Sequence, residues 1–204
     1  MTAVALVEQA YAVKKDDWIV VHAAAGGMGL ALCQLIHHLG AHVIGTVSSE
    51  EKVAIAKANG AEHVVVVAAN KGYEAFEKKV AELTHGLGVH AVFDGVGQAT
   101  FETSFNVAGR MGTLVLFGSS SGNIPPQPLM RFMAKNLKIA WVSLYTYVTT
   151  LEEFDQLYQK TLAFVQKGEL KIQVSKVYAF EDVKQAYLDL ESRKTTGKLL
   201  LKVN

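Results

Sequence analysis

The residues best placed to do chemistry in this sequence are small ones that follow an apolar run over residues 18–22. They read Ala24-x-Gly26-x-x-Gly29, the dinucleotide-binding pattern with alanine in place of its first glycine. Glycine lets backbone N–H groups approach a pyrophosphate, and the N-terminus of the following helix favours negative charge. Such turns also occur without a ligand, but this one lies where a βαβ unit would hold a phosphate. The residues expected to form this cofactor-binding turn are Gly26, Gly27, Met28 and Gly29.

The end of the second expected strand indicates which dinucleotide the turn would hold. An NAD site usually has an acidic residue about 20 residues beyond the glycines, where it binds the ribose 2′-hydroxyl. Val47 stands there in this sequence, and Ser48, Ser49 and Lys52 follow it. Hydroxyls and a lysine suit a 2′-phosphate, so NADPH is the expected cofactor. The alternative is a helix capped by the serines with a solvated lysine, and the two glutamates between them count mildly against a phosphate.

No set of side chains has the spacing of a nucleophile, its base and an orienting acid, so no catalytic residue is assigned. The seven histidines are scattered without carboxylate or cysteine neighbours at metal-ligand spacing, and no metal site is expected. Asp94 is the best-placed acid, and we expect it to accept hydrogen bonds from its own turn. The one cysteine, Cys33, lies among apolar residues and is expected to be a buried thiol.

Composition limits the class of protein. The chain has 204 residues, half of them hydrophobic, and a formal charge of +1, which gives no sign of a nucleic-acid face or a polybasic membrane patch. No apolar run reaches the roughly 20 residues that cross a bilayer, and the first residues lack the basic region of a signal peptide. We therefore expect a cytoplasmic protein with no membrane partner.

The order of expected strands and helices predicts the fold. Apolar strands alternate with amphipathic helices five times, which favours an α/β protein with a doubly wound parallel sheet of about six strands, of Rossmann type. After residue 168 this alternation ends, and a strand, a helix and a last strand are expected. We expect a cofactor-binding domain over residues 1–168 and a C-terminal segment over 169–204. The expected strands cover residues 18–22, 42–47, 62–67, 89–94, 113–117 and 137–144.

Motifs along the whole chain resemble one family. In chain order they are Ala23 to Gly29, Gly45 to Ser49 with Lys52, Phe93 to Gly97, Phe117 to Gly122 and Glu191 to Lys198. Together they resemble the zinc-independent quinone oxidoreductases of the zeta-crystallin group, in the medium-chain dehydrogenase/reductase superfamily. The resemblance implies NADPH-dependent reduction of quinones or related α,β-unsaturated carbonyls.

The resemblance also implies further contacts with the cofactor. Val96 would line its adenosine or ribose side, and Arg193 would reach it from the C-terminal segment. For Val96 and Phe117, packing at a strand end is an equal alternative, and Arg193 could equally be a solvated surface residue. The residues expected at the nicotinamide half are Phe117, Gly118 and Ser119.

Members of that family carry an N-terminal, β-rich GroES-like domain that supplies much of the substrate pocket. Met1 matches a helix in the middle of such proteins, so this chain is expected to lack that domain. The segment over residues 169–204 would pack toward it and would expose apolar surface in its absence. We expect cofactor binding with weak or no turnover from this chain alone.

An apolar strand over Leu137–Leu144 is expected at the sheet edge, where it invites pairing with another chain. In the resembled family this strand joins two subunits, so a homodimer is expected; the alternative is a strand covered by the next helix. Two other functions stay open, namely a non-catalytic cofactor-binding, RNA-binding or structural module of the zeta-crystallin type and the cofactor domain of an enoyl reductase. The near-neutral charge makes RNA the less favoured partner.

Overall fold

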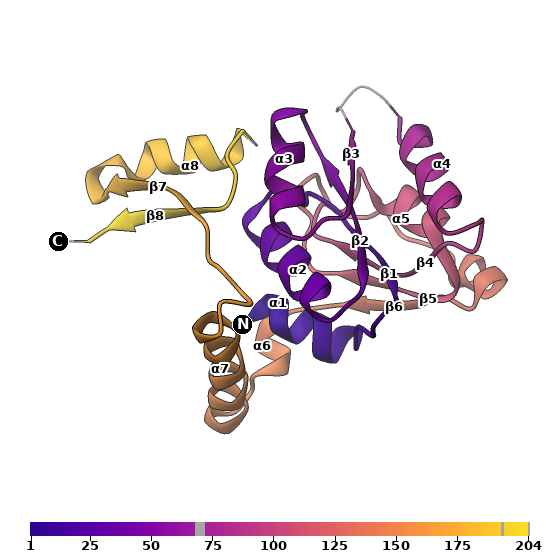
Figure 1. Cartoon of the computed structure of the whole chain (residues 1–204), viewed down its shortest axis with the longest axis horizontal. Helices are drawn as coiled ribbons and strands as arrows, with labels where there is room; N and C mark the ends of the chain where they lie inside the picture. Colours follow the sequence, from indigo (N-terminus) through magenta and orange to yellow (C-terminus); the bar gives the residue numbers. More distant parts are fainter. Residues whose placement is uncertain (68–71, 193, 204) are drawn as a thin grey trace.

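A computed structural model describes residues 1–67, 72–192 and 194–203. Its centre is a parallel sheet of six strands in the order β3-β2-β1-β4-β5-β6 (Figure 1). This is the strand order of a Rossmann fold, and the predicted fold class is confirmed. The strands are β1 Trp18–Val21, β2 His42–Val47, β3 His63–Val66, β4 Val89–Asp94, β5 Ala108–Leu116 and β6 Lys138–Trp141.

Helices cover both faces of the sheet. Consecutive residues of β1 are fully buried, as expected for a parallel strand packed on two sides: Ile19 faces one apolar cluster and Val20 the other. The first cluster holds α2 and α3, and the second holds α4 and α5. The helices of this part are α1 Thr2–Ala5, continued as the π-helix η1 Leu6–Ala10, α2 Gly27–His38, α3 Glu51–Ala58, α4 Glu74–Leu83 and α5 Phe101–Val107.

The chain beyond β5 crosses to the sheet edge and then leaves it. The 3₁₀-helix η2 (Leu129–Lys135) precedes β6, and the short helix α6 (Leu144–Tyr147) follows it. Helix α7 (Leu151–Gln166) then begins with a capping box, in which Thr150 Oγ1 accepts from the Glu153 N–H at 3.1 Å and the Glu153 carboxylate accepts from the Thr150 N–H at 3.0 Å. No helix in the described parts of the chain has the length and apolarity needed to cross a bilayer.

The C-terminal residues form a small unit beside the main sheet (Figure 1). Strand β7 (Val174–Ala179), the 3₁₀-helix η3 (Phe180–Asp182), helix α8 (Val183–Glu191) and strand β8 (Lys198–Lys202) follow one another, and β7 pairs in parallel with β8. The expected strand-helix-strand appendage is therefore present.

In the main sheet, two strands differ from the expected bounds by more than one residue at an end. Strand β5 begins at Ala108 instead of residue 113, because the expected turn over residues 108–112 joins the strand through an irregularity in its pairing with β4. Strand β6 is shorter than the expected 137–144. The Val142 N–H still donates to Leu116 O at 2.7 Å, and the chain then turns away from the sheet into α6.

Candidate functional site

The edge of the sheet where strands β1 and β4 end is the natural place for a ligand. The chain runs outward from β1 to β3 on one side and from β4 to β6 on the other, while β1 pairs directly with β4. In open α/β sheets a crevice forms where the strand order reverses in this way. All described residues predicted to bind the cofactor follow the carboxyl ends of β1, β2, β4 or β5, so they share this edge.

The glycine turn after β1 presents the backbone N–H groups that begin helix α2. Ala23 has a φ of 51°, and its carbonyl accepts from the Gly26 N–H at 2.9 Å, which closes the turn. The first bond of helix α2 runs from the Leu30 N–H to Gly26 O at 2.8 Å. The N–H groups of the first turn, Gly27 to Gly29, thus have no partner within the helix, and no acidic side chain lies there. This end of α2 fits an anionic group.

Glycine at position 29 is required by close packing. A Cβ atom there would lie 2.2 Å from Ala23 O and 2.7 Å from Ala24 Cα, so any side chain would push the helix off the turn. Gly45 of β2 plays the matching part on the next strand, because a Cβ atom there would lie 2.7 Å from Ala24 Cβ. The turn can therefore lie directly on the ends of β1 and β2.

A second group of predicted residues lies where β2 ends. Lys52 Nζ donates to Ser48 Oγ at 3.3 Å, so the lysine ammonium and this hydroxyl meet at one point. Burial lowers the pKa of Lys52, while the neighbouring Glu51 opposes that shift. The residue preceding helix α3 is Glu50, and no side chain in the described residues caps this helix end. In the described part of the chain the serines therefore do not act as side-chain caps of α3, and their role toward a phosphate stays a prediction.

The third group joins the ends of β4 and β5. Phe117 N–H donates to Asp94 O at 3.0 Å, and Val96 O accepts from both the N–H and the hydroxyl of Ser121 at 2.8 Å. Phe117 also packs against Gly95, where a Cβ atom would lie 2.5 Å from its ring. Val96, Phe117, Gly118 and Ser119 are thus brought together beside the crevice. Packing on Gly95 explains a phenylalanine at position 117 just as fully as a contact with a ligand would.

Arg193 lies outside the described residues. A nearby part of the same segment, Gly197, touches the glycine turn: its N–H donates to Ala25 O at 3.3 Å, and it forms a parallel bridge with Gly26. A Cβ atom on Gly27 would lie 3.1 Å from Gly197 O. The C-terminal unit is thus joined to the helix end that would hold the pyrophosphate.

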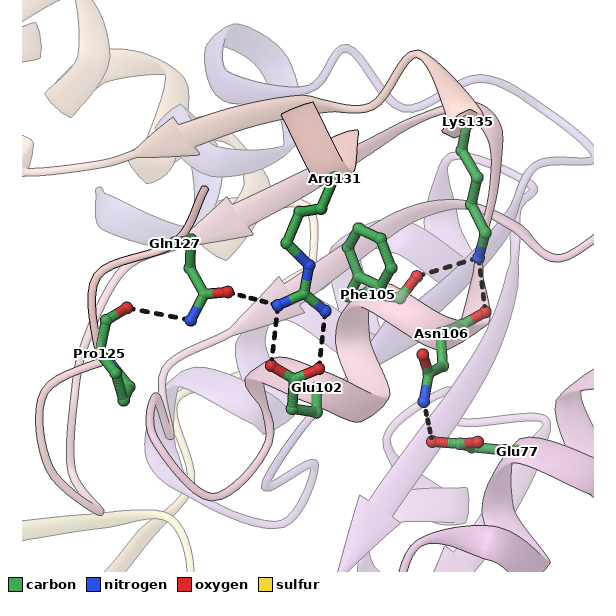
Figure 2. A network of polar contacts seen from close by, with 8 residues as sticks. All are labelled: Glu77, Glu102, Phe105, Asn106, Pro125, Gln127, Arg131 and Lys135. Atoms are coloured by element: carbon green, nitrogen blue, oxygen red, sulfur yellow. Dashed lines mark hydrogen bonds and ion pairs between the residues drawn. The ribbon is translucent and has the colours of Figure 1, made fainter. Parts of the chain in front are cut away.

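The loop that follows β5 is fixed at its far end by Arg131 of η2 (Figure 2). Its guanidinium donates to both carboxylate oxygens of Glu102 on α5, at 3.0 and 2.7 Å, and lies 4.1 Å from the centre of the Phe105 ring. Arg131 also donates to Gln127, which donates to Pro125 O at 3.0 Å. An arginine that pairs with both carboxylate oxygens and stacks on a ring fixes both the position and the orientation of the loop that carries it.

Lys135 completes this attachment at the C-terminal end of α5 (Figure 2). Its ammonium donates to three carbonyl oxygens, of Phe105 at 3.1 Å, Asn106 at 2.8 Å and Ala108 at 3.0 Å. These carbonyls end the helix and lack intrahelical partners, so a cation there is favourable. Burial lowers the pKa of Lys135. The loop that follows β5 is therefore held between the Asp94 turn and α5.

The structure also reveals a group of buried polar residues that the sequence did not single out for a role. His22 follows β1 directly, Thr46 lies in β2 and Ser104 in α5, and all three lie with Asp94 beneath the crevice, at most 5 % exposed. Ser, His and Asp are the residue types of a nucleophilic triad, but here the serine donates to the aspartate and all are enclosed, so no substrate can reach them. The one signal in the sequence was a histidine directly after an apolar strand.

Asp94 accepts hydrogen bonds from its own turn, as expected from the sequence. Its Oδ1 accepts from the N–H groups of Val96 and Gly97 at 2.8 and 3.1 Å and from the Thr100 hydroxyl at 2.8 Å. No group of three or more His, Cys, Asp or Glu side chains in the described part of the chain is arranged to hold a metal ion.

Comparison with known proteins gives one family. Residues 27–167 match the family described as zinc-binding dehydrogenases. The chain is 41 % identical over 204 residues to a probable quinone oxidoreductase of Schizosaccharomyces pombe, covering all of this chain and 60 % of that protein. It is 35 % identical to quinone oxidoreductase 1 of Escherichia coli, covering 98 % of this chain and 61 % of that one. A 2-haloacrylate reductase of a Burkholderia species is 32 % identical over 203 residues, 98 % of this chain and 60 % of its own length.

Solved structures agree with these relatives. A mycobacterial protein in complex with NADPH superposes with a TM-score of 0.93 at 39 % identity, over 98 % of this chain and 61 % of its own. The quinone oxidoreductase of Escherichia coli in complex with NADPH gives a TM-score of 0.91 at 34 % identity, over 99 % of this chain and 62 % of that one. The chain thus spans about 60 % of the length of the relatives it matches.

Proposed function

Because this chain belongs to the zinc-binding dehydrogenase family, we propose that it is the NADPH-binding part of an oxidoreductase that reduces quinones or related unsaturated carbonyls. The observation that carries the cofactor assignment is the Lys52–Ser48 contact at the end of β2, where an NAD site would have an acid. The relatives named quinone oxidoreductase and 2-haloacrylate reductase support the substrate class.

Each group of residues would hold one part of the cofactor. The N–H groups that begin α2 suit the pyrophosphate, and Ser48, Ser49 and Lys52 suit the 2′-phosphate. Val96 would border the adenosine or ribose side, and the loop of Phe117, Gly118 and Ser119 would border the nicotinamide half. Arg193 would reach in from the C-terminal segment. Bound NADPH supplies a hydride to the substrate. The residues of this chain would position the cofactor and keep water from one side of it.

The remaining wall of the substrate pocket would come from the part of the relatives that this chain does not span, a GroES-like domain in the resembled family. The C-terminal segment over 169–204 would pack toward it. Its apolar side chains support this proposal, since Val177 and Tyr187 are 57 % and 62 % exposed. A cavity of about 170 Å³ lies between α8 and β8. We therefore propose weak turnover, or none, from this chain alone.

We also propose that two copies pair through the free edge of β6. This strand ends the sheet, and its Ile139 and Trp141 side chains are 42 % and 58 % exposed. An exposed apolar edge strand is suited to pairing with another chain. The zeta-crystallin subgroup, the absence of a zinc requirement and a cytoplasmic location stay predictions from the sequence.

Titration of this chain with NADPH and NADH tests the cofactor proposal, with cofactor fluorescence as the signal. We expect NADPH to bind at least about tenfold more tightly than NADH, since charge-assisted contacts to the 2′-phosphate contribute about 1.5–3 kcal/mol. Adenosine 2′,5′-bisphosphate should displace NADPH. Absence of NADPH binding contradicts the proposed function, and equal affinities contradict the 2′-phosphate assignment.

A quinone assay tests the proposal that this chain alone turns over its substrate weakly or not at all. With NADPH and 1,4-benzoquinone, we expect turnover far below the roughly 10 s⁻¹ that is typical of enzymes. A rate in the ordinary range for a dehydrogenase would show that this chain carries a complete substrate site.

A further inference from the structure

The buried polar residues beneath the crevice form one continuous chain of hydrogen bonds. Thr46 Oγ1 lies 3.0 Å from His22 Nδ1, and His22 Nε2 lies 3.1 Å from Ser104 Oγ. Ser104 Oγ donates to Asp94 Oδ2 at 2.7 Å. At its other end, Thr46 Oγ1 accepts from the Ala23 N–H at 3.3 Å. The chain therefore runs from the glycine turn after β1 to the Asp94 turn after β4.

Counting hydrogens fixes the direction of each bond. The Asp94 carboxylate only accepts, so the single hydroxyl hydrogen of Ser104 is used there and Ser104 Oγ must accept from His22 Nε2–H. His22 Nδ1 is then free to accept from the Thr46 hydroxyl, whose oxygen accepts from the Ala23 N–H. Every donor in the chain has one acceptor, and the proton of His22 is on Nε2.

The surroundings of His22 agree with a neutral imidazole. The residue is 2 % exposed, with the Tyr73 ring edge-on at 6.2 Å and the Phe76 ring at 5.7 Å between centroids. Burial lowers the pKa of His22, while the charge of Asp94 opposes that shift. Desolvation is the larger effect, because Ser104 separates the imidazole from the carboxylate.

Both ends of this chain of bonds reach backbone that would contact the cofactor. Thr46 holds the N–H of Ala23, whose carbonyl closes the glycine turn. Asp94 holds the N–H groups of Val96 and Gly97, whose turn is bonded to the loop after β5. We propose that His22 is a positioning residue that fixes the pyrophosphate half and the nicotinamide half of the cofactor site relative to each other. This inference rests on the proposed NADPH binding.

A dinucleotide contacts both halves of its site, so its affinity depends on how the two halves are placed relative to each other. The affinity of a ligand that occupies one half does not depend on that placement. Binding of the second half of NADPH is intramolecular once the first half is bound, so its contribution depends on the relative placement of the two sub-sites. Breaking the His22 connection should therefore weaken NADPH more than adenosine 2′,5′-bisphosphate, which occupies the adenosine half alone.

The test uses Ser104→Ala and Thr46→Val, each of which removes one hydroxyl from the network. We expect each variant to raise the Kd for NADPH about tenfold and to change the Kd for adenosine 2′,5′-bisphosphate less than twofold. Because both substitutions break the same connection, the double variant should lose no more NADPH affinity than either single one. Thr46→Ser retains the hydroxyl and should bind NADPH as the unmodified chain does.

Thr103→Val is a matched control on the same helix. The Thr103 hydroxyl is buried next to Ser104, and within the described residues no hydrogen-bond partner is present for it. Its removal should leave NADPH affinity within twofold. If Ser104→Ala and Thr46→Val bind NADPH as tightly as Thr103→Val does, the inference is wrong. Equal losses for NADPH and the bisphosphate, or additive losses in the double variant, also overturn it, because a general loss of structure has that effect.

Nitrogen-15 NMR of the His22 ring tests the same inference without any cofactor. In the unmodified chain at pH 7, Nε2 should carry the proton and Nδ1 should not, and Ser104→Ala should change this signature. A protonated Nδ1 in the unmodified chain contradicts the network. This readout separates the two proposals: if the unmodified chain does not bind NADPH, the proposed function fails, whatever the tautomer of His22.

Discussion

Lys52 and Ser48 at the end of β2 carry the assignment of the 2′-phosphate site. The 3.3 Å contact between Lys52 Nζ and Ser48 Oγ brings a cation and a hydroxyl to one point. Capping of helix α3 by the serines was expected with or without a phosphate, but Glu50 precedes the helix and no side chain in its described surroundings caps it. Sequence spacing could place these residues at one strand end, and their role toward a phosphate stays a prediction.

The His22 network was not predictable in the same way. His22 meets Thr46 across 24 residues and Ser104 across 82 residues of sequence, so the contacts exist only once β1, β2 and α5 are packed. Asp94 was singled out from the sequence because it ends a strand, and its role as an acceptor in its own turn could be predicted locally. Local turn chemistry is visible in a sequence, whereas long-range polar contacts are not.

The Glu102–Arg131 pair gives a pH-dependent prediction. Hydrogen bonding to Arg131 lowers the pKa of Glu102, so the pair stabilises the fold above the ordinary carboxyl pKa of about 4.3 and loses that effect as the pH falls through the lowered value. Glu102→Gln should reduce the free energy of unfolding at pH 7 by less than about 1 kcal/mol, because the carboxylate is largely exposed. Urea unfolding at pH 7 and pH 3 measures this difference.

The difference between Glu102→Gln and the unmodified chain should shrink at pH 3. Glu181→Gln, at an exposed position outside this network, is the control and should show little effect at either pH. A Glu102→Gln deficit that is as large at pH 3 as at pH 7 would mean that the ion pair does not cause it.

At the scale of elements, strand types were predictable and strand ends were not. Apolar residues at consecutive positions identified β1 as a buried parallel strand. The boundaries of β5 and β6 depend on pairing with a neighbour: β5 extends back to Ala108 through its contact with β4, and β6 ends when the chain turns into α6. Pairing of this kind is a tertiary effect that local sequence does not encode.

The junction of β1 and α2 depends on Gly29. Gly29→Ala would place a Cβ atom 2.2 Å from Ala23 O, a backbone atom that cannot move without opening the turn. We expect the free energy of unfolding to fall by about 1–3 kcal/mol or more, and NADPH affinity to fall with it. Denaturant unfolding and cofactor titration together measure the two effects.

Gly27→Ala is the matched comparison two residues earlier. Its Cβ atom would lie 3.1 Å from Gly197 O, so this carbonyl would have to move by only a few tenths of an ångström. We expect a loss of stability below about 1 kcal/mol. Equal destabilisation by the two substitutions would contradict the close packing assigned to Gly29.

At the scale of the whole molecule, the cofactor crevice and the C-terminal unit are connected. Gly197 bonds to Ala25 in the glycine turn, and Lys171 bonds to Gln34 on α2 through its N–H at 2.7 Å and its carbonyl at 3.1 Å. The C-terminal unit also carries exposed apolar side chains. The sequence predicted both the unit and its apolar surface, because the motif order matched a longer protein. In the proposed arrangement, the surface that would cover these side chains belongs to the part of the relatives that this chain does not span.

The free edge of β6 tests the proposed homodimer. The Val142 N–H bonds inward to Leu116 O, and because N–H directions alternate along a strand, the Ile139 N–H points to the open edge. Proline is tolerated at such positions. Ile139→Pro should therefore keep the fold, measured by circular dichroism and unfolding, and should convert a dimer to a monomer in sedimentation. Ile139→Val retains the N–H and should remain dimeric.

A dimer that survives Ile139→Pro would exclude this edge as the interface. Proline at position 142 is unsuitable for the same test, because it would remove the bond to Leu116 within one chain.

The assignment of an NADPH site is tested most directly by the affinities of this chain and its Lys52→Ala variant for NADPH and NADH. We expect Lys52→Ala to weaken NADPH by about tenfold or more, since a charged contact contributes about 1.5–3 kcal/mol, and to change NADH less than twofold. Lys57→Ala, an exposed lysine on the same helix, should change neither. An unchanged NADPH affinity in Lys52→Ala, or an equal loss for both cofactors, would contradict the 2′-phosphate site at the end of β2.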